Sequence, residues 1–242
     1  MPKASYASLI LARFDPMRPA GEINASVLPD ALFLKVGADT RAAAQPAQTQ
    51  TAFKFAIFGL HSTLEHANQA LERRNEIAPW LEGAMEVWGA SLAPFRHFGE
   101  ANFVNPQNPG SQFEAMVPEP PAGTPIVIVT SAGWEQGENL DMARIQDFSE
   151  GVTGVRVSMT AVPGLHSQQT FNFPGGLVTD GITVTIWKDF VSARDFAYGP
   201  GLHKHQMKRQ REENLGDRTS FTRFKVVNSF GLWHGGDPLA WK

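Results

Sequence analysis

The stretch ITVTIWKDFVSARDFAYGPGLHKHQMKR, residues 182–209, decides the fold because it has a counterpart earlier in the chain. The segment FKFAIFGLHSTLEHANQALERRNEIAPW, residues 53–80, aligns with it without gaps, 129 positions upstream, so that Ile57 matches Ile186. In both segments alternating apolar residues predict a strand, and a helix is expected to follow it. This internal similarity indicates that one structural unit occurs twice.

Each segment extends into a unit with the order strand, helix, strand, strand, helix, strand, which is the ferredoxin-like arrangement. Periodicity predicts the elements, and glycine and proline predict the breaks between them. In the first unit we expect elements at residues 6–13, 22–27, 31–36, 51–58, 63–91 with a break near Pro79, and 94–98. In the second unit we expect them at residues 126–130, 140–149, 155–159, 182–187, 192–211 and 222–227.

These elements predict an α+β protein with two domains. Residues 1–104 form the first ferredoxin-like repeat, residues 105–124 a proline-rich linker, and residues 125–242 the second repeat. Two four-stranded sheets packed face to face would make a pseudo-symmetric dimeric α+β barrel within one chain. A space between sheet and helices could hold a flat or elongated apolar ligand, although a fold alone does not select that ligand.

The composition excludes several classes of function. The chain has 242 residues, 42% of them hydrophobic, and a formal charge of -3, which is typical of a globular protein. The basic run at residues 204–211 is followed directly by Glu212 and Glu213, so we interpret it as a solvated helix face and expect no nucleic-acid partner. Since there are no cysteines, disulfides, iron–sulfur clusters and thiolate-ligated haem are excluded.

Targeting segments and common catalytic motifs are missing from the sequence. The apolar run near the N-terminus is shorter than a signal-peptide core, and no stretch approaches the ~18 apolar residues of a membrane span, so we expect a cytoplasmic protein. No dinucleotide-binding GxGxxG, Walker GxxxxGK[ST], HExxH or GxSxG motif occurs in the required context.

Five motifs in the second half carry a resemblance to a known family. They are GVRVSMTAVPGLH at 154–166, WKD at 187–189, GPGLH at 199–203, FTRF at 221–224 and WHGGDPL at 233–239. In these motifs the chain resembles the spheroidene monooxygenase family, clearly over about half of its length and loosely over the rest. The resemblance implies a haem-dependent monooxygenase, with non-covalently bound haem b, that needs an electron donor.

The substrate and the oligomeric state are less defined. Residues 167–181, SQQTFNFPGGLVTDG, form a longer connection than the one associated with the family, so we expect a small, largely apolar organic substrate that need not be a carotenoid. The number of subunits is not predicted.

His203 is the predicted iron ligand, because a haem without cysteine needs an imidazole, or less often Tyr or Met, and this residue occupies the family's histidine position. The alternative is that His203 is a surface histidine at the start of a polar helix. His205 lies two residues on and would face another side of the helix. Trp187 and Phe196 are also predicted to contact the cofactor, whereas the spacing of the aromatic residues as a whole is typical of core residues.

Three further residues are predicted to act on the opposite side of the cofactor. Arg156, expected within a strand, could meet a haem propionate or steady bound oxygen, and His166 and Gln168 are candidate hydrogen-bond donors. Alternatively Arg156 points outward from its strand and His166 is an ordinary loop residue. The remaining histidines, His61, His66, His97 and His234, are expected to be structural.

Three functions remain open from the sequence. The first is a haem monooxygenase or related haem enzyme. The second is a haem carrier or sensor without turnover, which the same His203 would serve. The third is a cofactor-free α+β-barrel oxygenase or binding protein in which histidines and arginines position the substrate directly.

Overall fold

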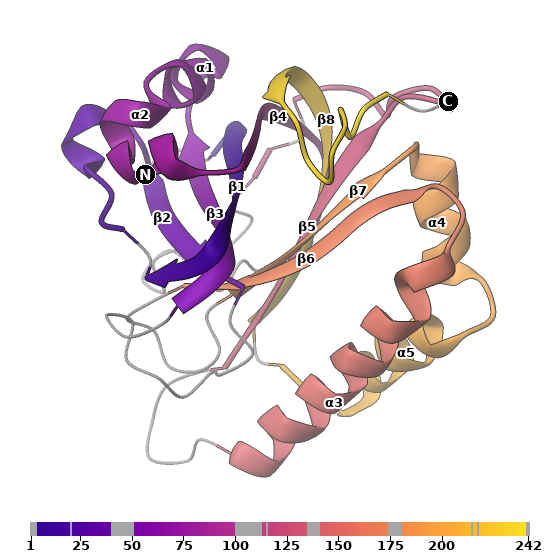
Figure 1. The fold of residues 1–242 in the computed structure, drawn as a ribbon. Coiled ribbons are helices and arrows are strands. Elements are labelled where there is room, and N and C mark those ends of the chain that lie inside the picture. Colours follow the sequence, from indigo (N-terminus) through magenta and orange to yellow (C-terminus); the bar gives the residue numbers. More distant parts are fainter. Residues whose placement is uncertain are drawn as a thin grey trace.

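The computed structural model describes residues 4–19, 21–39, 51–99, 113–114, 116–134, 141–173, 181–213, 215–216 and 218–240. Its strands are β1 (Tyr6–Pro19), β2 (Phe33–Ala38), β3 (Thr51–His61), β4 (Glu86–Gly99), β5 (Ile126–Gly133), β6 (Leu165–Asn172), β7 (Gly181–Trp187) and β8 (Arg218–Gly231). Its helices are α1 (Leu64–Glu72), α2 (Arg74–Ile77), α3 (Met142–Ser158), α4 (Phe190–Tyr198) and α5 (Leu202–Glu213), with 3-10 turns at Ala25–Val27, Pro79–Gly83 and Met159–Ala161. The predicted α+β class is confirmed (Figure 1).

The strands form one closed barrel in the order β1-β3-β2-β6-β7-β5-β8-β4. Within each half the order is fourth, first, third, second strand, and all pairings are antiparallel. The aligned segments therefore lie in corresponding strands, β3 and β7. The halves meet through a long ladder between β4 and β8 and through the single pair Ala38–Asn172 between β2 and β6.

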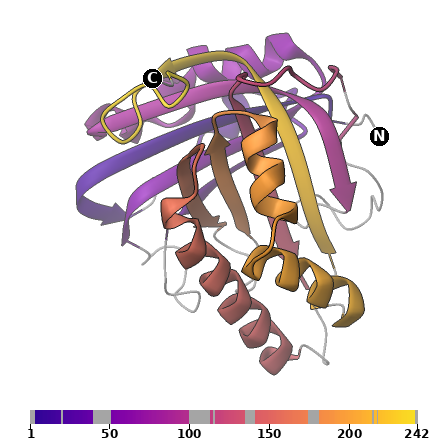
Figure 2. The same cartoon turned by 90° about the vertical axis from the view of Figure 1, so that its right-hand side faces the viewer.

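Three clusters of buried side chains account for the core. Because side chains alternate along a strand, Leu9 and Leu11 of β1 enter the cluster inside the barrel, whereas Ile10 and Ala12 enter a cluster beneath α1 and α2. The third cluster lies on the outer face of the second half and includes Trp187. Figure 2 shows α3, α4 and α5 together on that flank of the barrel.

The predicted strand at residues 155–159 is wrong. These residues form the last turn of α3 and the start of the following 3-10 turn. The alternation in VRVSM resembles a strand, but Val155 and Met159 are four residues apart and pack together on one helix face against the sheet. The helix predicted at 140–149 consequently extends to Ser158.

The second strand of the second half is β6 instead, and the sequence did not predict it. Ser167, Gln169 and Phe171 are buried on one face of β6, so two of its three inward residues are polar and the hydrophobic alternation is weak.

The long helices were also predicted with wrong limits. The helix expected at 63–91 ends in short turns, and β4 begins at Glu86 because Trp88 pairs with Leu11 of β1 and fills the barrel. The helix expected at 192–211 is two helices, α4 and α5, separated at Gly199–Pro200–Gly201. Gly201 has φ 156°, which favours glycine, and proline ends the preceding helix.

The helix predicted at 22–27 is only the 3-10 turn Ala25–Val27. Residues 105–112 and 115 of the predicted linker lie outside the described residues, and residues 116–124 contain neither helix nor strand. In the part of the chain that is described, no helix is both long and apolar enough to cross a bilayer.

Candidate functional site

Helix α5 packs on helices α3 and α4. None of its residues is buried. Arg209 donates to Asp147 of α3 at 2.6 Å, and the side chain of Gln206 lies against Gly151 of α3, where a Cβ would meet it at 2.6 Å. The ion pair with Asp147 and the contact at Gly151 therefore hold α5 on α3. They leave every side chain of α5 at least partly exposed.

The sheet beneath these helices is correspondingly half-covered. Ile128 and Thr130 of β5 and Thr183 of β7 alternate with buried residues, so they point outward, and all three are only half-buried. The hydroxyls of Thr170 and Thr183 lie 2.9 Å apart across β6 and β7. This outer face combines small polar groups with apolar ones, as ligand pockets do.

The ring of His203 is held by a backbone hydrogen bond. Its Nδ1 lies 3.1 Å from the carbonyl oxygen of Ala197, and because a carbonyl only accepts, Nδ1 carries the proton and donates. Burial lowers the pKa of His203, although the carbonyl opposes that shift, so the ring is neutral near pH 7. A neutral ring protonated at Nδ1 leaves a lone pair on Nε2, and a backbone acceptor of this kind fixes the orientation of ligating histidines.

The structure brings the predicted cofactor residues Trp187, Phe196 and His203 together. The Phe196 ring lies 5.1 Å from the His203 ring and 5.6 Å from the Trp187 ring. Trp187 is fully buried, and its Nε1 donates to Thr185 at 2.8 Å. The three rings form a continuous aromatic wall between β7 and α5.

Gln168 lies on the same face as this wall. It pairs with Thr185 in the β6–β7 ladder, and its Nε2 is buried without a hydrogen-bond partner among the described residues. A buried donor without an acceptor is unfavourable, so it is suited to meet a ligand.

The other two predicted catalytic residues lie elsewhere. Arg156 is in the last turn of α3, half-exposed, and not within a strand. His166 is on β6 and not in a loop, and its ring lies 6.5 Å from that of His234, beside Trp233 of the barrel interior. The structure therefore does not bring Arg156, His166 and Gln168 together as one group.

Two residues to which the sequence analysis gave no role stand out beside α5. Arg223 of β8 is 8% exposed, and its Nη2 lies 3.4 Å from the hydroxyl of Tyr198. Arg223 belongs to the FTRF motif, so the motif marked the position, but nothing in the sequence indicates that Arg223 is buried.

A second buried histidine has no access to solvent. His61 and Ser8, on the outer face of the first half, are joined by a 2.8 Å hydrogen bond, and both are at most 2% exposed. Burial lowers the pKa of His61 to about 4, and neighbouring His66 adds to that shift. The pair resembles a nucleophile and its base, but no substrate could reach it.

No group of three or more His, Asp or Glu side chains within the described residues could hold a bare metal ion.

Comparison with known proteins agrees with the sequence motifs. The chain is 27% identical over 169 residues to a spheroidene monooxygenase of Rhodobacter capsulatus, which covers 67% of this chain and 62% of that protein. A spheroidene monooxygenase of Cereibacter sphaeroides is 36% identical over 59 residues, or 24% of this chain and 18% of that protein. The similarity to spheroidene monooxygenases is thus confirmed, although the chain spans less than two thirds of these relatives. No family model matches the chain.

Solved structures support the fold. An aldoxime dehydratase, OxdRE in complex with butyraldoxime, superposes with a TM-score of 0.54 and 11% identity, covering 93% of this chain and 80% of that one. A second aldoxime dehydratase structure gives a TM-score of 0.51 and 13% identity, with 93% and 82% covered. At these identities the likeness concerns the fold alone.

Proposed function

We propose that the chain is a haem-dependent, monooxygenase-like enzyme that acts on a small, largely apolar organic substrate. The observation that carries this proposal is the His203 imidazole, neutral, fixed through Nδ1 and with Nε2 left for a metal. The monooxygenase names of the curated relatives support the reaction class.

The residues on the outer face of the second half fit a haem. The aromatic wall of Trp187 and Phe196 suits a flat macrocycle, and His203 beside that wall would hold its iron. The unsatisfied Nε2 of Gln168 offers a hydrogen bond next to the same wall. Without cysteines the haem would be held non-covalently, as haem b.

Each residue then has a defined task. A bound haem would supply the activation of oxygen. His203 would hold the iron, and the Ala197 carbonyl keeps the ring in one tautomer. Phe196 and Trp187 exclude water, while Thr185 fixes the Trp187 ring. Gln168 would donate a hydrogen bond to a bound ligand, and an oxygenation would also need an external electron donor.

The two halves divide this work in our proposal. Residues 125–242 form the ferredoxin-like repeat that binds the cofactor, residues 105–124 link it to the first, and residues 1–104 form the repeat that closes the barrel. Arg156 and His166 stay predictions as catalytic residues, since Arg156 is half-exposed on α3 and His166 faces His234.

An absorbance spectrum of purified protein after haem supplementation tests the proposal. We expect a Soret band that persists through gel filtration, and its absence would exclude haem in favour of a cofactor-free protein. Incubation of the loaded protein with a reductant, oxygen and apolar candidate substrates then separates an enzyme from a haem carrier or sensor, which would show the band but no oxygenated product.

A further inference from the structure

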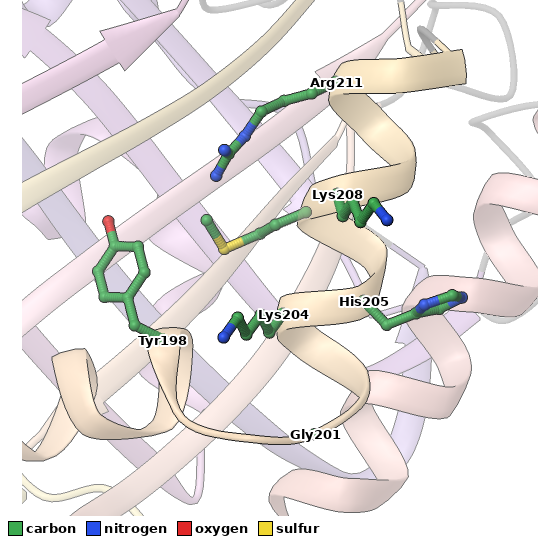
Figure 3. A pocket seen from close by; sticks show the side chains of 7 residues that line it. Tyr198, Gly201, Lys204, His205, Lys208 and Arg211 are labelled. Atoms are coloured by element: carbon green, nitrogen blue, oxygen red, sulfur yellow. The ribbon is translucent and has the colours of Figure 1, made fainter.

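A basic groove of about 450 Å³ runs along α5 on the side of Tyr198. It is lined by Tyr198, Gly201, Lys204, His205, Met207, Lys208 and Arg211. None of these residues is acidic. Figure 3 shows the side chains of Tyr198, Lys204 and Arg211 directed to one side of α5, with His205 on its other flank. Lys208 has an exposed partner in Glu212 at 3.8 Å.

Arg223 places a buried cation next to this groove. Its guanidinium lies 4.8 Å from the centre of the Phe190 ring and 5.6 Å from that of Phe98, and it is 3.4 Å from the Tyr198 hydroxyl. Within the described ranges no carboxylate lies at ion-pair distance from it. Aromatic faces compensate a buried charge only in part, whereas an anion would compensate it fully.

Tyr198 connects the two features, because its ring lines the groove and its hydroxyl contacts Arg223. The combined surface has cations at Lys204, Arg211 and Arg223 and apolar contact area at Tyr198 and Met207. A ligand that fits it has an apolar body and an anionic end. Arginine and lysine recognise a carboxylate at such an end through charge-assisted hydrogen bonds.

We propose that Arg223, Tyr198 and the groove along α5 form a binding site for the carboxylate of a largely apolar organic acid. Two molecules could bring that carboxylate: a haem, through its propionates, or an acidic substrate. The haem source rests on the proposed function, and the substrate source does not.

Binding measurements with three probes test the site. Haemin and haemin dimethyl ester are titrated by absorbance, and dodecanoate is titrated by calorimetry. Arg223→Gln is compared with Arg96→Gln, a matched control because Arg96 also stacks on Phe98, at 5.1 Å, but is half-exposed and does not contact Tyr198. A double variant, Lys204→Gln with Arg211→Gln, alters only exposed groove positions and covers the case in which Arg223→Gln does not fold.

If the propionates occupy the site, Arg223→Gln should weaken haemin at least about tenfold and leave the dimethyl ester unchanged. If a substrate acid occupies it, dodecanoate binding should weaken by a similar factor while both haemins bind normally. Unchanged binding of haemin and dodecanoate in both variants would overturn the proposal. So would a wild-type protein that binds no carboxylate probe. If the wild-type protein binds neither haemin nor its ester, the proposed haem function is wrong. The dodecanoate titration then still tests whether the carboxylate site exists.

Discussion

The two halves of the barrel share one strand order but differ in what covers their outer faces. In the first half α1, α2 and the turn at Pro79–Gly83 seal the sheet, and the sealing cluster includes Phe55, Leu71 and Ile77. In the second half the corresponding cluster is smaller, and α5 contributes no buried residue to it. The outer face of the sheet is therefore sealed in the first half and only half-covered in the second half.

This difference separates two histidines, His61 and His203, as candidate ligands. His61 and His203 both have lowered pKa values because both are removed from water. His61 is 0% exposed and hydrogen-bonded to Ser8, whereas His203 is half-buried and its hydrogen bond to Ala197 uses Nδ1. A neutral histidine becomes useful to a cofactor only where the helical layer leaves room.

The largest difference between the two halves should appear in the free energy of unfolding of core variants. Ile77→Ala removes a fully buried side chain from the sealed half, and we expect it to lower the free energy of unfolding by about 2–5 kcal/mol. Met207→Ala on α5 should cost less than about 1 kcal/mol, because Met207 is only half-buried. Urea denaturation of both variants measures the difference. Equal losses would mean that α5 is packed as tightly as the first half.

His61 should make stability depend on pH. Its folded pKa of about 4 lies below the ordinary value near 6.5, so the unfolded chain takes up the proton first as pH falls. Stability present above about pH 6.5 should therefore be lost toward pH 4, by up to about 3 kcal/mol. Urea denaturation across that range tests this, with His61→Gln as the variant whose slope should flatten. The lowered pKa of His203 acts with the same sign.

If the proposed function is correct, substitutions in the half-covered second half should change the affinity for haem. His203→Ala should weaken haem binding by more than about 100-fold, because it removes the axial nitrogen itself. Haem titration followed at the Soret band gives the affinity. His205→Ala leaves the His203 ring and the cations Lys204 and Arg211 in place, so it is the comparison variant and should weaken haem binding far less. If only the His205 variant loses haem binding, the ligand is His205 and not His203. If both variants keep haem binding, His166 is the next candidate ligand.

The sequence predicted the strands whose apolar alternation is strong and failed where polarity or helical spacing obscured it. Residues 182–187 were placed correctly in β7 because ITVTIW alternates cleanly. β6 was missed since Ser167 and Gln169 are polar residues facing the barrel interior, where Ser167 accepts from Trp233 and Gln169 from Lys54. Such residues are buried because of partners more than sixty positions away, which no local pattern reveals.

The candidate site was predictable to a similar extent. Trp187, Phe196 and His203 lie close in the sequence, within one strand, turn and two helices, and the structure brings them together. Arg156 was misplaced with its strand. Arg223 could not be recognised, because the rings beside its guanidinium, Phe190 and Phe98, come from distant parts of the chain.

The smallest expected effect concerns how α5 is attached. Gly151 and Gly154 lie on α3 facing α5, and alanine in a helix interior is usually more stable than glycine by about 0.5–1 kcal/mol. Gly154→Ala should show this gain, since its Cβ would meet only the Leu202 side chain at an ordinary 3.9 Å. Gly151→Ala should gain less or lose, because Gln206 must move from 2.6 Å. Thermal denaturation compares the stability of the two variants. Equal gains would show that α5 does not pack on α3 at Gly151, and the inferred attachment of α5 to α3 would then be wrong.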